Sequence, residues 1–138
     1  PDIRATGVIS VISNVMPGPI AEMSKAILNG NLTRAEHLKN VLDPLFKVVT
    51  VNTIESYEGF DVPCRFRNPV AIKTMMNGLG MPSGPCRPPL GKITPKGAEV
   101  VRRALKEVYE KDRNVFTPIK EFYKINIEER LSNDRFWK

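Results

Sequence analysis

The sequence predicts an α/β chain in which one buried β-strand and its helix precede a mostly α-helical region. The first observation is the run 7–15, GVISVISNV, which is rich in β-branched residues and leaves no polar face. Such a strand is typically covered on both faces, as in a parallel sheet under helices. The second observation is that no other run in the chain offers it a parallel partner for its backbone groups. We therefore expect a piece of something larger, or a chain that lies against another chain.

The composition is that of a globular domain of ordinary size, with 138 residues, 41% of them hydrophobic and 26% charged. No apolar run is long enough to span a membrane, and no leader indicates secretion, so we expect a cytoplasmic location and no membrane partner. The net charge of +6 could mark a nucleic-acid or phosphate-binding face. We favour solvated helix faces and no nucleic-acid partner, because the Lys and Arg residues are scattered and not interleaved with exposed aromatics.

Metal and redox chemistry have little support in the sequence. Cys64 and Cys86 allow one disulfide at most, and without a secretion signal we expect free, buried thiols. His37 is the single histidine, too few ligands for a zinc site, so we expect no metal. A lone His on a helix is usually a surface or packing residue, and we discount His37 as a catalytic base.

The first two helices follow the strand directly. Pro17 and Pro19 end the strand and open a helix that Gly30 closes as a C-cap. Thr33 and Glu36 form a capping box for a second helix, which contains Pro44 and runs to about residue 46. The stretch 48–51 is either a strand or the end of this helix, and residues 52–67 are expected to form a long loop.

Two further helices and a short helical end complete the chain. Asn68-Pro69 is expected to supply an N-cap and a first-turn proline for a helix that ends near Gly78 and Gly80. The Pro- and Gly-rich stretch 81–91 is expected to be extended, and Thr94-Pro95 opens a strong helix. Residues 113–138 carry many aromatic side chains and predict one or two short helices packed on something.

Several segments, in this order, resemble dihydrodipicolinate synthases, members of the pyruvate-dependent Schiff-base aldolase and lyase family that includes N-acetylneuraminate lyase. The segments are Gly7-Val8-Ile9-Ser10-Val11, Asn68-Pro69-Val70-Ala71-Ile72-Lys73, Leu79-Gly80, Arg87-Pro88-Pro89-Leu90 and Ile93-Thr94. The resemblance covers about residues 5–112. Residues 113–138 have no counterpart in the family pattern, and the loop 52–67 is longer than usual.

The resemblance implies a C-terminal fragment of a (β/α)8 TIM barrel, followed by a mostly α-helical C-terminal domain. Such a barrel alone takes about 250 residues, so it does not fit in this chain. Residues 1–30 would be the last barrel strand and helix, residues 31–112 the helical domain, and residues 113–138 an extension docked on the barrel or on a neighbouring subunit. The implied partners are the missing N-terminal barrel portion and further copies, in a homo-oligomer of two or four chains.

The chemistry that the resemblance implies is a condensation of pyruvate with aspartate semialdehyde, on the route to lysine and diaminopimelate, with no cofactor. The Schiff-base lysine and the catalytic tyrosine would lie upstream, so we expect no catalytic residue in this chain and no activity from it alone. The one substrate contact implied is the main-chain carbonyl of Ile9, which would face the pyruvate-derived imine. The alternative is that Ile9 is simply a core residue.

Three other functions stay open. Within the family, the parent could be an N-acetylneuraminate lyase or a keto-deoxy-sugar aldolase, because the residues that select the second substrate lie upstream. In a different class, the chain could be a basic helical binding module without catalysis. It could also be a complete enzyme that uses Lys47, which lies between two apolar residues, although lysines on amphipathic helices usually extend into solvent.

Overall fold

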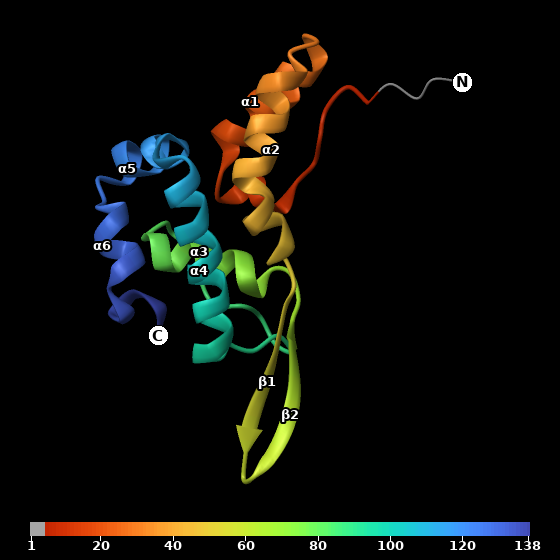
Figure 1. Ribbon diagram of the computed structural model, residues 1–138. Helices are drawn as coiled ribbons and strands as arrows, with labels where there is room; N and C mark the ends of the chain where they lie inside the picture. Colours follow the sequence, from red (N-terminus) through yellow and green to blue (C-terminus); the bar gives the residue numbers. More distant parts are fainter. Residues whose placement is uncertain (1–4) are drawn as a thin grey trace.

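A computed structural model describes residues 5–138 and shows a mixed α/β chain, with its helices gathered above a projecting β-hairpin (Figure 1). The two strands, β1 and β2, form one antiparallel sheet in the described part. The elements are η1 (Val11–Asn14), α1 (Pro17–Leu28), α2 (Leu32–Lys47), β1 (Val51–Tyr57), β2 (Phe60–Phe66), α3 (Val70–Leu79), α4 (Pro95–Lys111), η2 (Arg113–Phe116), α5 (Thr117–Tyr123), α6 (Ile127–Ser132) and η3 (Asp134–Trp137). The α/β class is confirmed.

The strand predicted over residues 7–15 is wrong for the chain as the structure shows it. Residues 7–10 have no regular structure, and Val11–Asn14 form the 3₁₀ helix η1. Without a parallel neighbour, a strand here would leave its backbone groups unpaired, whereas the helical turn pairs them locally. The amide of Met16 donates to the carbonyl of Ile12 at 2.8 Å, and that of Ser13 donates to the carbonyl of Ser10 at 3.1 Å.

Helices α1 and α2 pack as an antiparallel pair around a tight turn at Gly30. Gly30 has a φ of +75°, as expected for a glycine that closes a helix, and the amide of Asn31 reaches back to the carbonyl of Ala26 at 2.8 Å. The predicted capping box is wrong, because Asn31 rather than Thr33 caps α2 by accepting from the amide of Arg34 at 3.1 Å. Asn is as good an N-cap as Thr, and here it starts the helix two residues earlier.

The long loop predicted over residues 52–67 is also wrong, since these residues form the β1–β2 hairpin. The pairing runs from Val51 opposite Phe66 to Tyr57 opposite Phe60. Glu58 and Gly59 between the strands both have positive φ, 51° and 83°, the backbone that a two-residue hairpin turn requires. The open question at residues 48–51 is answered at Val51, where β1 begins after α2 has ended at Lys47.

Helices α3 and α4 flank the Pro-rich segment, which is neither helix nor strand, as predicted. The predicted N-cap at Asn68 is wrong: Pro69 takes the cap position of α3 and supplies no side-chain hydrogen bond. Gly80 ends α3 in the left-handed region, with a φ of 81°. Thr94 caps α4 as predicted, because its Oγ1 accepts from the amide of Gly97 at 3.1 Å.

A single hydrophobic core joins α1, α2, α3 and α4 with residues from the C-terminal segment. The predicted short helices of residues 113–138 are present as α5 and α6, flanked by η2 and η3. Docking on a barrel or on a neighbouring subunit was expected, but the structure places η3 and α6 against α3 and α4 of the same chain. The division at residues 30 and 112 stays a prediction. No helix between residues 5 and 138 is long and apolar enough to cross a membrane.

Candidate functional site

The candidate substrate contact, Ile9, lies in an extended segment that leaves the body of the molecule. Its side chain is fully exposed, so the alternative that Ile9 is a core residue does not hold in this structure. Within the described part of the chain, residues 5–9 make no hydrogen bond through their backbone. The segment therefore presents free backbone donors and acceptors, including the Ile9 carbonyl.

The segment is anchored where it meets the core. Ile12, Val15 and Met16 are fully or almost fully buried directly after it. The Ser10 side chain accepts from the amide of Ile12 at 3.3 Å, and the Ser13 hydroxyl donates to the Ser10 carbonyl at 2.5 Å. These contacts define the point at which the exposed segment leaves the fold.

An apolar cavity of about 300 Å³ lies beside this anchor. The corner between η1 and α1 forms one wall with Met16 and Pro17, and α5 forms another with Ile119 and Tyr123. Phe122, largely exposed, stands on the same helix. The C-terminal segment thus reaches the residues that follow the candidate contact, which the sequence did not indicate.

Lys47 does not have the environment of a Schiff-base lysine. Its Nζ lies 2.5 Å from the Asp43 carboxylate, and 72% of its side chain is exposed. The hydrogen bond to Asp43 raises the pKa of Lys47, and the same contact lowers the pKa of Asp43. A lysine nucleophile needs a depressed pKa, which desolvation or a neighbouring cation supplies. The interpretation of the chain as a complete enzyme using Lys47 therefore has no support in this geometry.

The other candidate groups do not assemble a reaction centre. His37 is half-exposed, and its Nε2 lies 3.6 Å from the Asp112 carboxylate. Cys64 and Cys86 are free, as predicted, but each is only partly buried, so the prediction of buried thiols is wrong. Among residues 5–138, no three His, Cys, Asp or Glu side chains come together in a group that could hold a metal ion.

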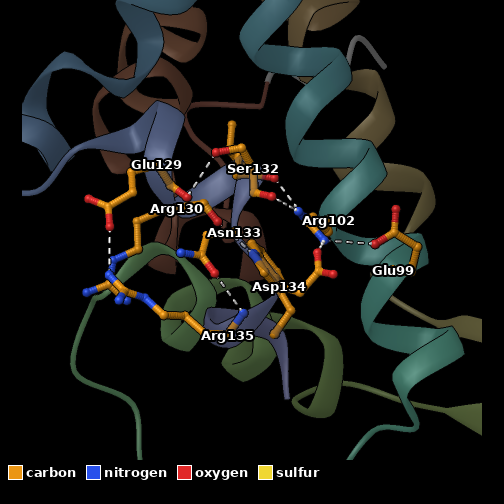
Figure 2. A network of polar contacts seen from close by, with 10 residues as sticks. Glu99, Arg102, Glu129, Arg130, Ser132, Asn133, Asp134 and Arg135 are labelled. Atoms are coloured by element: carbon orange, nitrogen blue, oxygen red, sulfur yellow. Dashed lines mark hydrogen bonds and ion pairs between the residues drawn. The ribbon is translucent and has the colours of Figure 1, made fainter.

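The most connected polar residue is Arg102 in α4, which no motif in the sequence singled out (Figure 2). Only 6% of Arg102 is exposed. Its guanidinium donates to the Leu131 carbonyl at 2.7 Å, to the Ser132 carbonyl at 2.6 Å and to the Asp134 carboxylate at 2.5 Å. These three contacts let α4 hold the C-terminal segment, and a longer contact at 3.4 Å joins Arg102 to Glu99 within α4 itself.

The cause of this arrangement is that α4 turns Arg102 toward the core. The residue lies four positions after the buried Ala98, hence on the same helix face. Once buried, the cation is stable only if every donor finds an acceptor, and the end of α6 supplies two carbonyls. The Arg102 side chain holds the pKa of the Asp134 carboxyl below its ordinary value. In the sequence, the one sign that Arg102 is buried was its position as a single arginine on an otherwise apolar face of the helix.

The sequence of the chain is similar to that of a known protein family. The model of the dihydrodipicolinate synthetase family matches residues 2–108. A protein of Methanothrix thermoacetophila named 4-hydroxy-tetrahydrodipicolinate synthase is 36% identical over 103 residues, which is 75% of this chain and 30% of the relative. A protein of the same name from Aquifex aeolicus is 35% identical over 105 residues, which is 76% of this chain and 31% of the relative.

The chain thus spans about 30% of the length of the curated relatives that it matches. No solved structure matches it significantly. The family match stops at residue 108, before the end of α4, so η2, α5, α6 and η3 lie outside it.

Proposed function

Because the chain belongs to the dihydrodipicolinate synthetase family, we propose that it is the C-terminal part of a lyase that condenses pyruvate with aspartate semialdehyde. The product would be 4-hydroxy-tetrahydrodipicolinate, on the route to lysine and diaminopimelate. The observation that carries the proposal is the match over residues 2–108, supported by relatives whose names state this synthase activity.

The structure adds two physical reasons to treat the chain as one part of the catalyst. Lys47, the candidate lysine of this chain, is exposed and paired with Asp43, which raises its pKa, so we assign the Schiff-base lysine to a part of the parent protein outside these residues. The segment 5–9 is extended and exposed, and its backbone has no hydrogen-bond partner among residues 5–138. We assign it as the last strand of a (β/α)8 barrel, which forms when the earlier strands supply those partners.

The proposed reaction begins when the lysine amine attacks the pyruvate ketone and water leaves, which forms an imine. The imine withdraws electrons, so the methyl carbon loses a proton and adds to the aldehyde carbon of aspartate semialdehyde. The new hydroxyl takes up a proton, and the amino group of the adduct then attacks the imine carbon. The ring closes and the lysine is released.

Ile9 takes part in this proposal through its backbone. Barrel active sites lie at the carboxyl ends of the strands, and Ile9 precedes the anchored turn where this strand would end. A main-chain carbonyl in that place can accept a hydrogen bond or face the positive charge of the imine. Its position would be set by the buried residues Ile12 and Val15 that follow it.

Reductive trapping tests the assignment of the lysine. The complete parent protein and this chain are each incubated with labelled pyruvate and borohydride, which turns the imine into a stable secondary amine. We expect one adduct in the parent, on a lysine outside these residues, and none in the chain alone. Lys47→Arg in the parent should leave the adduct yield unchanged. Labelling of Lys47, or of any lysine in this chain, overturns the proposal.

The second substrate is tested separately on the parent. Turnover of pyruvate with aspartate semialdehyde is expected, and cleavage of N-acetylneuraminate or of a keto-deoxy sugar acid in its place would assign the parent to another branch of the family. Homo-oligomer formation and a cytoplasmic location stay predictions.

A further inference from the structure

The β1–β2 hairpin projects beyond the helices (Figure 1). It also exposes large apolar side chains. Alternation along the paired strands puts Val51, Thr53, Tyr57, Phe60 and Val62 on one face. At the base of this face Val51 and Thr53 are buried, whereas towards the tip Tyr57 is 67% and Phe60 74% exposed. Glu55 lies on the same face between these two parts. The face that contributes to the core at its base thus ends in an uncovered aromatic surface at its tip.

Both edges of the hairpin are blocked at their centres. On β2, Pro63 has no N–H to offer an added strand, and it lies opposite Ile54. On β1, the Ile54 carbonyl already accepts from Lys96 Nζ at 2.6 Å. Extension of the sheet by another strand is therefore disfavoured, and a partner has to meet the face and tip of the hairpin.

The hairpin is also acidic in a basic chain. Residues 51–66 contain three carboxylates, Glu55, Glu58 and Asp61, against the single cation Arg65. The next stretch, residues 67–98, has the opposite balance, because it contains five Lys and Arg residues and no Asp or Glu.

A cavity of about 500 Å³ opens in this basic stretch, between α3 and the Pro-rich segment. Its lining is mixed: Val70, Leu90 and Ile93 supply apolar side chains, and the polar side chains are those of Lys73, Thr74, Asn77, Ser83 and Lys92. Lys92 is exposed and forms no ion pair within residues 5–138. The Ser83 hydroxyl, buried at the same cavity, has no hydrogen-bond partner in the described part of the chain.

We propose that the hairpin tip of one chain docks in this cavity of a second copy, and that the exchange is reciprocal. Phe60 or Tyr57 would enter the cavity against Val70, Leu90 and Ile93, and Glu58 and Asp61 would meet Lys92 and the neighbouring Arg87. A reciprocal exchange of one arm for one cavity has twofold symmetry and closes after two copies. The hairpin tip and the cavity are complementary surfaces on separate parts of one chain. A second copy therefore offers a cavity to the hairpin of the first and a hairpin to its cavity.

The area involved is sufficient for a dimer. Tyr57 and Phe60 together expose on the order of 300 Å² of side chain. Two arms, each covering a similar area on its partner, would bury about 1,200 Å², the lower end of stable interfaces. Docking of the hairpin in its own cavity is opposed by its base, where the Glu55 carboxylate accepts from Thr94 Oγ1 at 2.7 Å and holds β1 to the start of α4.

A charge exchange tests the proposal on the 138-residue chain, by sedimentation velocity. The hairpin variant is Glu58→Lys with Asp61→Lys, and the cavity variant is Arg87→Glu with Lys92→Glu. Each alone should weaken self-association about tenfold or more. An equimolar mixture should restore it, since each hairpin then meets a cavity of opposite charge. Lys120→Glu, on the distant helix α5, is the control and should leave association unchanged.

Cross-linking tests the contact itself, and it does not depend on the association constant. One copy carries Phe60→Cys, Cys64→Ser and Cys86→Ser, and a differently tagged copy carries only Cys64→Ser, which leaves Cys86 at its cavity. A short bis-maleimide should join the two tags. In the control, Ser56→Cys replaces Phe60→Cys. Because Ser56 lies on the opposite face of the hairpin, the yield of cross-linked product should be much lower.

The proposal is overturned by any of three results. The wild-type chain could stay monomeric at high micromolar concentration. The mixed charge variants could fail to associate better than either alone. Phe60→Cys and Ser56→Cys could cross-link equally. None of these results bears on the lyase chemistry, which the pyruvate-trapping experiment tests separately.

Discussion

The indole of Trp137 lies directly over Gly78, so close that a Cβ at position 78 would overlap the ring. Trp137 is almost fully buried, and its Nε1 donates to the Arg130 carbonyl at 2.7 Å. The last turn of the chain is therefore packed on α3 through a glycine in the last turn of that helix. Gly78 is in a helix, where glycine is otherwise unfavourable, and the close approach of the ring explains its presence.

Gly78→Ala should destabilise the chain by about 2 kcal/mol, because the added methyl group forces the indole out of its site. Thermal denaturation followed by circular dichroism measures the effect. Gly84→Ala is the control, since nothing lies within 4 Å of a Cβ at that position. Trp137→Leu should cost stability alone, yet in combination with Gly78→Ala the two losses should be less than additive. Full additivity would mean that the two residues do not interact.

Arg102→Met should destabilise the chain by about 2 kcal/mol, since it leaves the buried carbonyl of Leu131 and the partly buried carbonyl of Ser132 without the donors that Arg102 supplies. Denaturant unfolding gives the free energy, and tryptophan fluorescence reports on Trp137 in the same segment. Arg103→Met, one position along α4 and exposed, should change stability by less than about 0.5 kcal/mol. Equal effects at the two positions would contradict the role assigned to Arg102.

The Arg102–Asp134 contact should make the stability of the C-terminal segment depend on acid pH. The pKa of Asp134 is lowered from its ordinary value of 3.8, first by the hydrogen bond from Arg102 and then by its charge. The ionised carboxylate thus stabilises the folded state above that ordinary value, and this contribution is lost as the pH falls through the folded-state pKa. The effect should be small, because the Asp134 side chain is 78% exposed and solvent screens it.

The measurement is the melting temperature of the wild-type chain and of Asp134→Asn between pH 7 and strongly acid pH. The variant should be less stable at neutral pH, and the two curves should converge as the wild-type carboxyl becomes protonated. If the melting temperatures of the two proteins changed in parallel over the whole pH range, the Arg102–Asp134 contact would make no pH-dependent contribution to stability.

Truncation at the C-terminal end should destabilise the chain strongly, whereas truncation at the N-terminal end should destabilise it little. Deletion of residues 113–138 removes Phe116, Ile119, Leu131 and Trp137 from the shared core, so we expect loss of cooperative thermal unfolding. Deletion of residues 1–10 is the matched comparison. It removes the exposed segment 5–9, which has no backbone hydrogen bonds in the described part, and the cap that Ser10 provides for η1. The melting temperature should therefore fall much less than after the first deletion.

In the complete parent the same ten-residue deletion is expected to abolish pyruvate trapping, because it removes Ile9 and the proposed barrel strand. Retention of trapping after this deletion would contradict the barrel assignment of the segment. A large fall in the melting temperature of the short chain would contradict its description as an exposed, unpaired segment.

The helical content could largely be predicted from local chemistry. Thr94 and Pro95 begin α4, and Gly80 ends α3, because caps and left-handed glycines act within a few residues. The errors at the starts of α2 and α3 have the same origin. Asn31 rather than Thr33 occupies the N-cap position of α2, and Pro69 rather than Asn68 occupies that of α3. The alternative helix starts differ by little free energy, so the surrounding chain decides between them.

The hairpin could have been predicted better. Its turn residues, Glu58 and Gly59, lie between Tyr57 and Phe60, a recognisable hairpin pattern, but Pro63 and the mixed charges hid the strands. An edge strand tolerates a proline, because one side of each strand needs no hydrogen bond.

By itself the sequence determined the α/β class, most helices and the family, because these depend on short-range periodicity, capping and ordered motifs. Only the tertiary structure decided the state of residues 7–15, since strand pairing needs neighbours that are distant in sequence or absent from the chain. It also decided that Arg102 is buried and that Trp137 covers Gly78. These contacts join residues that lie about thirty or more positions apart along the chain, where no local pattern registers them and close packing alone selects the pairs.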